Sequence, residues 1–191
     1  MAIVGLVLAW LAMLLLGAGD VDRALLFELY AGRNQPLAAA ALVMTFFGSG
    51  WFVTLASAVG ALVLAIRKEM RAALVLLVAT AVGKALVELQ KYEIDRLRPD
   101  SFPHLVQVHN LSFPSGHSAN AAMTYVLLAF LLTRAGTARR VAVSAALVVT
   151  ALIGLSRVML GVHWPSDVVG GWAFGLLWAM LALSLAKPGR T

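Results

Sequence analysis

The chain has 191 residues, of which 61% are hydrophobic and 13% charged, and its mean hydropathy is +0.89. These values exclude a disordered chain and a soluble enzyme, and they indicate an integral membrane protein. The absence of cysteine excludes disulfides, thiol nucleophiles and cysteine-ligated metal centres, while the net charge of +6 lacks the aromatic-interleaved basic runs of a nucleic-acid partner site.

Apolar stretches alternate with short polar segments in the first third of the chain. Residues 2–18 are interpreted as a first span rather than a signal peptide, because no Lys or Arg precedes them. Residues 19–36 mix charged and apolar side chains, which predicts a short amphipathic helix lying at the membrane interface. Residues 36–66 exceed one span, and the Gly48-Ser49-Gly50 sequence is expected to interrupt them, leaving a second span near residues 44–66.

Four further spans are predicted after the basic loop at residues 67–71. The third begins at Ala72 and becomes polar toward its end, and Pro99, Pro103 and Pro114 predict an extended loop after it. Residues 115–133, 141–156 and 165–186 supply three more spans. The sequence therefore predicts an all-α polytopic membrane protein with six transmembrane helices, in which residues 1–191 form one domain without internal repeats.

The charges of the loops predict the orientation of the chain. Basic residues in membrane proteins concentrate in cytoplasmic loops. The larger set of eight is expected on the cytoplasmic side and consists of Arg67, Lys68, Arg71, Arg134, Arg139, Arg140, Lys187 and Arg190. Both termini should then be cytoplasmic, and the loop at residues 91–117 should be external.

Three polar clusters fall on this predicted external side, at residues 91–99, 113–118 and 156–167. Ionisable groups near a bilayer are costly, so such clusters are candidates for function. Three cations in them are suited to hold phosphate oxygens. Lys91 and Arg98 are seven residues apart, which would place them on one face of a continuous helix, and Arg157 adds a planar guanidinium fork.

The second cluster resembles the start of a phosphate-binding helix. If Pro114 is the first helical residue, the backbone N–H groups of Ser115, Gly116 and His117 are unpaired donors that favour an anion. The side chain of His117 would then lie beside the bound phosphate, placed to protonate a leaving oxygen and later to activate water.

The third cluster contains a candidate nucleophile. Asp167 follows His163 by four residues, and Pro165 can open the sixth span, so Asp167 would sit in its first turn and orient the imidazole. The free ring nitrogen of His163 could attack phosphorus and form a phosphohistidine that water hydrolyses.

The three clusters resemble the signature motifs of the type 2 phosphatidic acid phosphatase superfamily. They have the form Lys91-x6-Arg98-Pro99, then Pro114-Ser115-Gly116-His117, then Ser156-Arg157-x5-His163-x3-Asp167, and together they cover residues 91–167. The resemblance implies that Lys91, Arg98 and Arg157 hold the phosphoryl oxygens with help from Ser115 and Gly116. It also implies that His163 is the nucleophile, Asp167 its partner and His117 the acid and base, and Arg96 fits a commonly basic position of the first motif.

A charged stripe in the third span lies outside this pattern. Its members, spaced by four, three, four and three residues, are Lys84, Glu88, Lys91, Asp95 and Arg98. If the helix continues to Arg98, the stripe faces the bundle interior. A buried Lys84–Glu88 pair that fixes the rotation of the helix is the favoured interpretation, and tuning of the Lys91 site is the other.

The sequence predicts a lipid phosphatase of the cell membrane that acts at the external face and uses neither metal nor cofactor. His104 and His109 have poor spacing for metal ligands. The resemblance implies undecaprenyl pyrophosphate, phosphatidylglycerol phosphate, phosphatidate or lipid A phosphates as substrates. A lipid phosphotransferase with the same phosphohistidine and a non-enzymatic lipid transporter remain as alternatives, and the oligomeric state is open.

Overall fold

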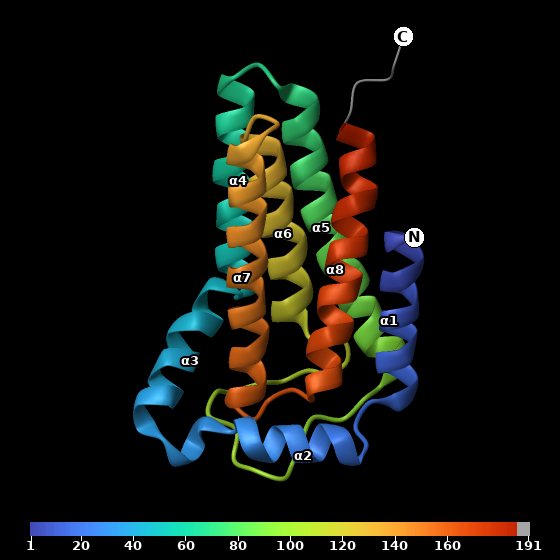
Figure 1. Cartoon of the computed structure of the whole chain (residues 1–191), viewed down its shortest axis with the longest axis vertical. Coiled ribbons are helices and arrows are strands. Elements are labelled where there is room, and N and C mark those ends of the chain that lie inside the picture. Colours follow the sequence, from blue (N-terminus) through green and yellow to red (C-terminus); the bar gives the residue numbers. More distant parts are fainter. Residues whose placement is uncertain (187–191) are drawn as a thin grey trace.

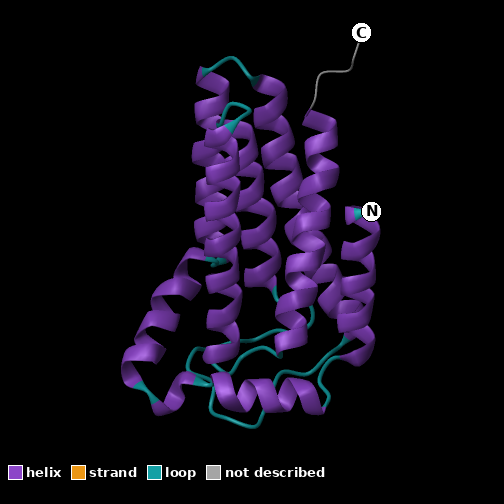
Figure 2. Cartoon of the chain, viewed as in Figure 1, coloured by secondary structure: helices purple, strands orange, loops and turns teal. Residues whose placement is uncertain are grey.

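The computed structural model describes residues 1–186, and every regular element in that range is helical (Figures 1 and 2). Lys187 and Arg190, which entered the prediction of orientation, lie outside the described residues. The elements are α1 (Ala2–Leu16), α2 (Asp20–Leu29), a 3₁₀ turn η1 (Ala31–Arg33), α3 (Gln35–Phe47), α4 (Gly50–Ile66), α5 (Met70–Ile94), α6 (Gly116–Leu132), α7 (Thr137–Met159) and α8 (Pro165–Ala186).

Three of these helices, α5, α7 and α8, are long and apolar enough to cross a membrane. The number rises to five if each of two bent pairs, α1 with α2 and η1, and α3 with α4, counts as one span. Helix α6 is apolar and shorter, with 17 residues. The chain is therefore a multi-pass membrane protein.

The predicted helix after the first span and the predicted interruption at Gly48-Ser49-Gly50 are both present. The α2 and η1 segment turns by 94° from α1, as expected of a helix lying along the interface, and it crosses one end of the bundle (Figure 1). Helices α3 and α4 meet at a 45° bend at Gly48 and Ser49. A side chain at Gly48 would lie 2.4 Å from Ile153 on α7 and 3.2 Å from the His117 ring, so this bend requires glycine.

Helix α6 is the centre of the bundle and contacts α4, α5, α7 and α8. Its contact with α8 is close because Gly171 faces it, where an added Cβ would lie 2.7 Å from the Ser115 carbonyl oxygen. Gly170, the residue before Gly171, lies against the Phe113 ring, where an added Cβ would be 2.6 Å from the ring, so both glycines serve close packing.

The prediction that the third span stays helical to Arg98 is wrong. Helix α5 ends at Ile94, and Asp95 has the left-handed φ of 52° that terminates it. Asp95 is exposed, and the chain then runs as an extended loop to Ser115. Arg98 therefore does not share a helix face with Lys91.

The two ends of the bundle differ in their loops (Figure 1). The α4–α5 and α6–α7 loops lie at one end, toward which α1 begins and α8 ends. Helix α2, the loop at residues 95–115 and the α7–α8 connection lie at the other end. All three polar clusters consequently meet at that second end.

Candidate active site

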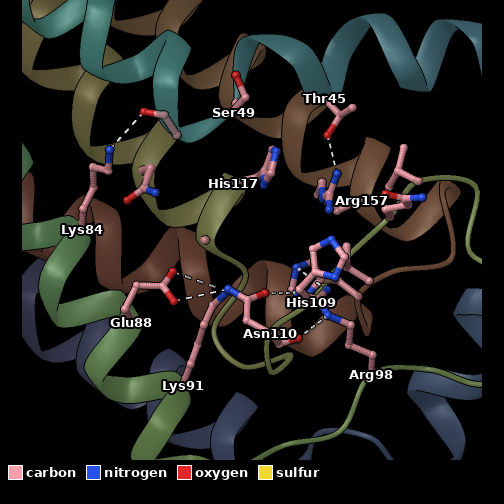
Figure 3. A pocket seen from close by; sticks show the side chains of 18 of the residues that line it. Thr45, Ser49, Lys84, Glu88, Lys91, Arg98, His109, Asn110, His117 and Arg157 are labelled. Carbon is pink, nitrogen blue, oxygen red and sulfur yellow. Dashed lines mark hydrogen bonds and ion pairs between the residues drawn. The ribbon is translucent and has the colours of Figure 1, made fainter.

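A cavity of about 590 Å³ opens between the α3–α4 bend, α5, the start of α6, and the loop at residues 106–110 (Figure 3). It brings together six of the eight predicted site residues, namely Lys91, Arg98, Gly116, His117, Arg157 and His163. The other two, Ser115 and Asp167, are fully buried behind the cavity wall.

His163 has one ring nitrogen toward the protein and one toward the cavity. Pro165 begins α8 as predicted, which places Asp167 in its first turn. The His163 Nδ1 atom lies 3.4 Å from Asp167 Oδ2, and Nε2 accepts from the Arg98 guanidinium at 3.1 Å. This pairing places the ring proton on Nδ1 and leaves Nε2 unprotonated at the cavity, where its lone pair accepts from Arg98.

The Asp167 carboxylate is fixed by more groups than the sequence indicated. Ser112 donates to Oδ2 at 2.5 Å, and the Trp164 backbone N–H donates to the same oxygen at 2.9 Å. The Ser112 hydroxyl also lies 3.3 Å from His163 Nδ1. Sequence reasoning missed Ser112, whose only local signal is a hydroxyl directly before the Phe113-Pro114 pair.

Arg96 also holds Asp167, a role that its position in the first motif did not predict. Its Nη1 atom forms an ion pair with Asp167 Oδ1 at 2.9 Å, and its Nη2 donates to the carbonyl oxygens of Met13 and Leu14 at 3.0 and 2.6 Å. Those carbonyls belong to the last turn of α1, where no intrahelical donor remains. The guanidinium also lies over the Phe113 ring, 4.4 Å from its centre.

Helix α2 is hydrogen-bonded to the first turn of α8, next to Asp167. Asp22, predicted to lie in an interfacial amphipathic helix, is buried and accepts hydrogen bonds from the Ser166 backbone N–H at 2.9 Å and from the Ser166 hydroxyl. Ser166 also accepts from Arg96 at 3.2 Å. The first turn of α8 is thus held by both N-terminal helices.

Three cations surround the cavity beside His163. Lys91 is 5% exposed and lies 3.7 Å from Glu88. Arg98 reaches the cavity from the loop, where its Nε donates to the Asn110 carbonyl at 2.7 Å. Arg157 is buried and donates to Thr45 Oγ1 at 2.6 Å, while its Nε has no partner among residues 1–186.

The start of α6 differs by two residues from the prediction. The helix begins at Gly116, not Pro114, with Ser115 as its N-cap. The Ser115 N–H donates to the Asp167 carbonyl oxygen at 3.0 Å, so it is not available to a ligand. The N–H groups of Gly116 and His117 lie in the first turn without intrahelical acceptors, and a Cβ at Gly116 would lie 3.6 Å from Lys91 Nζ.

Burial, together with the charges at the site, keeps His163 neutral. Burial lowers the pKa of His163 well below its usual value, and the positive charges of Arg98, Arg157 and Lys91 lower it further. Burial also lowers the pKa of Arg98, against the opposing effect of Asp167 and Glu88. A neutral imidazole that is unprotonated at Nε2 is the form that can attack phosphorus.

The predicted Lys84–Glu88 pair is wrong. Lys84 Nζ donates instead to Thr54 Oγ1 at 2.7 Å and to the Gly50 carbonyl oxygen at 3.0 Å. Glu88 is exposed and faces Lys91 and the Asn110 side-chain amide. Both residues line the cavity, so the favoured structural interpretation gives way to a position at the site.

The two outer-loop histidines differ in position. His104 Nε2 lies 2.7 Å from the Pro99 carbonyl oxygen, and His109 lines the cavity (Figure 3). Within residues 1–186, no three His, Asp or Glu side chains are grouped as metal ligands.

Comparison with known proteins decides the family. A family model described as the PAP2 superfamily matches residues 72–189. The chain belongs to the PAP2 superfamily. Among curated relatives, phosphatidylglycerophosphatase B of Bacillus subtilis is 40% identical over 108 residues, which are 54% of this chain and 53% of that protein.

Two other PAP2 relatives extend the likeness. Undecaprenyl-diphosphatase of Sulfolobus acidocaldarius is 28% identical over 139 residues, covering 69% of this chain and 63% of that protein. The chain thus spans between half and two thirds of these two curated relatives. The crystal structure of a transmembrane PAP2-type phosphatidylglycerolphosphate phosphatase from Bacillus subtilis matches with a TM-score of 0.84 and 30% identity, over 95% of this chain and 94% of that one.

Proposed function

We propose that this PAP2 protein is a membrane lipid phosphatase that hydrolyses a phosphate monoester or a diphosphate through a phosphohistidine at His163. One observation carries the proposal: His163 presents its unprotonated Nε2 to a cavity in which three cations lie beside it, one of them Arg98 in hydrogen-bond contact, while its Nδ1 is backed by Asp167. The three relatives named above are phosphatases of lipids, which supports this chemistry.

In the first step, His163 Nε2 attacks phosphorus and the bond from phosphorus to the leaving oxygen breaks. Lys91, Arg98 and Arg157, with the Gly116 and His117 N–H groups, hold the nonbridging oxygens, whose charge must be stabilised in the transition state. His117 donates a proton to the leaving oxygen. The Nδ1 proton of His163 stays on the ring, and the positive charge that develops there is stabilised by Asp167.

In the second step, water attacks the phosphohistidine and the phosphorus–nitrogen bond breaks. His117, now neutral, accepts the proton of the water, which restores both histidines and releases inorganic phosphate. Ser115 supports this arrangement indirectly, by fixing the start of α6 to α8. No step uses a metal or a cofactor.

A phosphate-release assay tests the function. Purified protein in detergent should release inorganic phosphate from at least one of undecaprenyl pyrophosphate, phosphatidylglycerol phosphate, phosphatidate and lipid A. Activity should persist in EDTA, and vanadate should inhibit, because vanadate adopts the five-coordinate geometry of the transition state.

Two outcomes would contradict this mechanism. Strong inhibition by EDTA that zinc or magnesium reverses would require a metal. Transfer of the phosphoryl group to an added lipid alcohol, without release of phosphate in its absence, would identify a phosphotransferase.

The proposed topology has six spans, formed by α1, α4 with α3 leading into it, α5, α6, α7 and α8. The cavity would open at the external face of the cell membrane, because the other end of the bundle holds six basic residues against the single acid Glu69, whereas the basic residues at the cavity end are accompanied by many acids. Lipid substrates would enter from the bilayer, with their phosphate at the level of the interface.

Cysteine labelling tests the orientation. The chain has no native cysteine, and Ser101 and Ala135 are exposed in loops at opposite ends of the bundle. In intact cells or right-side-out vesicles, an impermeant maleimide should label Ser101→Cys from outside and Ala135→Cys only after permeabilisation. The opposite pattern would invert the topology.

A further inference from the structure

The cavity extends beyond the groups that hold one phosphate. Its far wall is formed by the α3–α4 bend and by Lys84 on α5, and His117 stands between this wall and the Arg98 side (Figure 3). The contacts agree with the view, since the Cβ position of Gly48 is 3.2 Å from the His117 ring and Lys84 Nζ is 3.0 Å from the Gly50 carbonyl oxygen. A leaving group that departs past His117 would meet this wall.

Helix α4 begins at this wall with its N-terminus uncapped. Ser49 is the N-cap residue, but its side chain makes no capping hydrogen bond, and its buried Oγ has no partner among residues 1–186. The first N–H groups of α4 therefore lack acceptors, and the positive end of the helix dipole lies at the cavity.

Lys84 is placed where its charge is unfavourable unless an anion binds. An ammonium group is repelled by a helix N-terminus, and it is costly on a helix that crosses the membrane. Nor does α4 need it as a cap: Gly50 is the first residue of that helix, and its carbonyl is already within the helical hydrogen-bond pattern. Lys84 is only partly buried and lines the cavity, so its ammonium can contact a ligand.

Asn120 is a further polar side chain at this wall. It lies one turn after His117 on α6 and lines the cavity. The residue is 8% exposed, and its Oδ1 has no hydrogen-bond partner among residues 1–186. Because Oδ1 only accepts, Asn120 would contact a phosphoryl oxygen through its Nδ2 amide, which is a donor.

The charge of the cavity exceeds what one phosphate balances. Its wall carries four cations, Lys84, Lys91, Arg98 and Arg157, against the single carboxylate of Glu88. Before either histidine is counted, this leaves three positive charges, whereas a phosphate monoester carries about 1.5 to 2 negative charges at pH 7.

We infer that Lys84, Ser49, Asn120 and the N-terminus of α4 form a second anion subsite, which binds a second phosphoryl group carried by the leaving group of the lipid. The inference rests on the proposed function for the orientation of the substrate. A diphosphate lipid offers this group directly, and a phosphatidylglycerol phosphate offers it as the phosphodiester on its glycerol. Phosphatidate, whose leaving group is uncharged, leaves the subsite empty.

Two substrate pairs test the subsite. Farnesyl diphosphate is compared with farnesyl phosphate, and phosphatidylglycerol phosphate with phosphatidate of the same acyl chains. In Lys84→Met and in Asn120→Leu, the ratio of kcat/KM for the doubly phosphorylated member over its partner should fall by about tenfold or more, as expected for loss of one charge-assisted contact. Lys84→Arg should restore much of the ratio.

The matched control is Lys68→Met, which removes the same charge in the α4–α5 loop at the other end of the bundle and should keep the wild-type ratio. If the kcat/KM ratio falls only for the farnesyl pair, the subsite binds diphosphates. If it falls only for phosphatidylglycerol phosphate over phosphatidate, the subsite binds the phosphodiester. Unchanged ratios in both pairs, or equal losses on both members of each, would overturn the inference.

A binding measurement separates this inference from the proposed function. By calorimetry, methylenediphosphonate should bind wild type more tightly than methylphosphonate does, and Lys84→Met should lose that difference. A protein that shows the difference but hydrolyses no lipid phosphate would retain the subsite and lose the proposed function. Equal binding of the two phosphonates by wild type would overturn the subsite whatever the activity.

Discussion

Substitution of His163 by alanine should abolish phosphate release, with a loss on the order of 10⁴-fold or more, because removing a covalent nucleophile removes the chemical step itself. Substrate should still bind, since the cations and the N–H groups of α6 remain. After an alkaline denaturing quench, the same variant should yield no base-stable, acid-labile phosphoenzyme from a ³²P-labelled substrate, whereas wild type should be labelled on His163.

His104→Ala is the matched control. That imidazole bonds the Pro99 carbonyl oxygen in the outer loop and does not line the main cavity. The His104→Ala variant should keep both phosphate release and the ³²P label on the enzyme. Wild-type turnover in His163→Ala, or a label that persists there, would assign the nucleophile to another residue.

Arg96→Met should be the most destabilising single change at this end of the bundle. The side chains of Arg96 and Asp167 are 10% and 0% exposed and 2.9 Å apart, and breaking a buried ion pair from one side costs about 3–5 kcal/mol because the other charge is stranded. Activity should fall as well, because Asp167 loses one of the groups that hold it against His163.

The measurement pairs thermal unfolding in detergent with phosphate release. Arg23→Met serves as control, because its ion pair with Asp20 is exposed and such pairs contribute little. Asp167→Asn combined with Arg96→Met should recover stability without activity, since neither charge is then left unpaired. A melting temperature of Arg96→Met equal to that of wild type would show that Asp167 is not fixed by this pair.

Local spacing explains what the sequence could predict. The His163–Asp167 contact spans four residues and depends only on where α8 begins, which Pro165 indicates. The bend at Gly48 and the interfacial α2 also have local signals, in small residues and in amphipathic composition. These features required no knowledge of which helices become neighbours.

The remaining contacts join residues that are distant in the chain. Ser112 meets Asp167 across 55 residues, Arg96 meets it across 71, and Lys84 meets Gly50 across 34. The charge spacing in α5 suggested a Lys84–Glu88 pair, because spacing along one helix indicates only neighbours on that helix. The structure supplies better hydrogen-bond acceptors for Lys84 on α4, and the left-handed Asp95 ends the helix before Arg98.

The bond between Arg96 and the carbonyl oxygens of Met13 and Leu14 has a consequence for biosynthesis. Helix α1 is held by the same guanidinium that fixes Asp167 in α8. The groups around His163 are therefore assembled only when α8 has entered the bilayer and packed against α1. Under the proposed mechanism, a nascent chain whose α8 has not yet packed would hold Asp167 out of place and would be inactive.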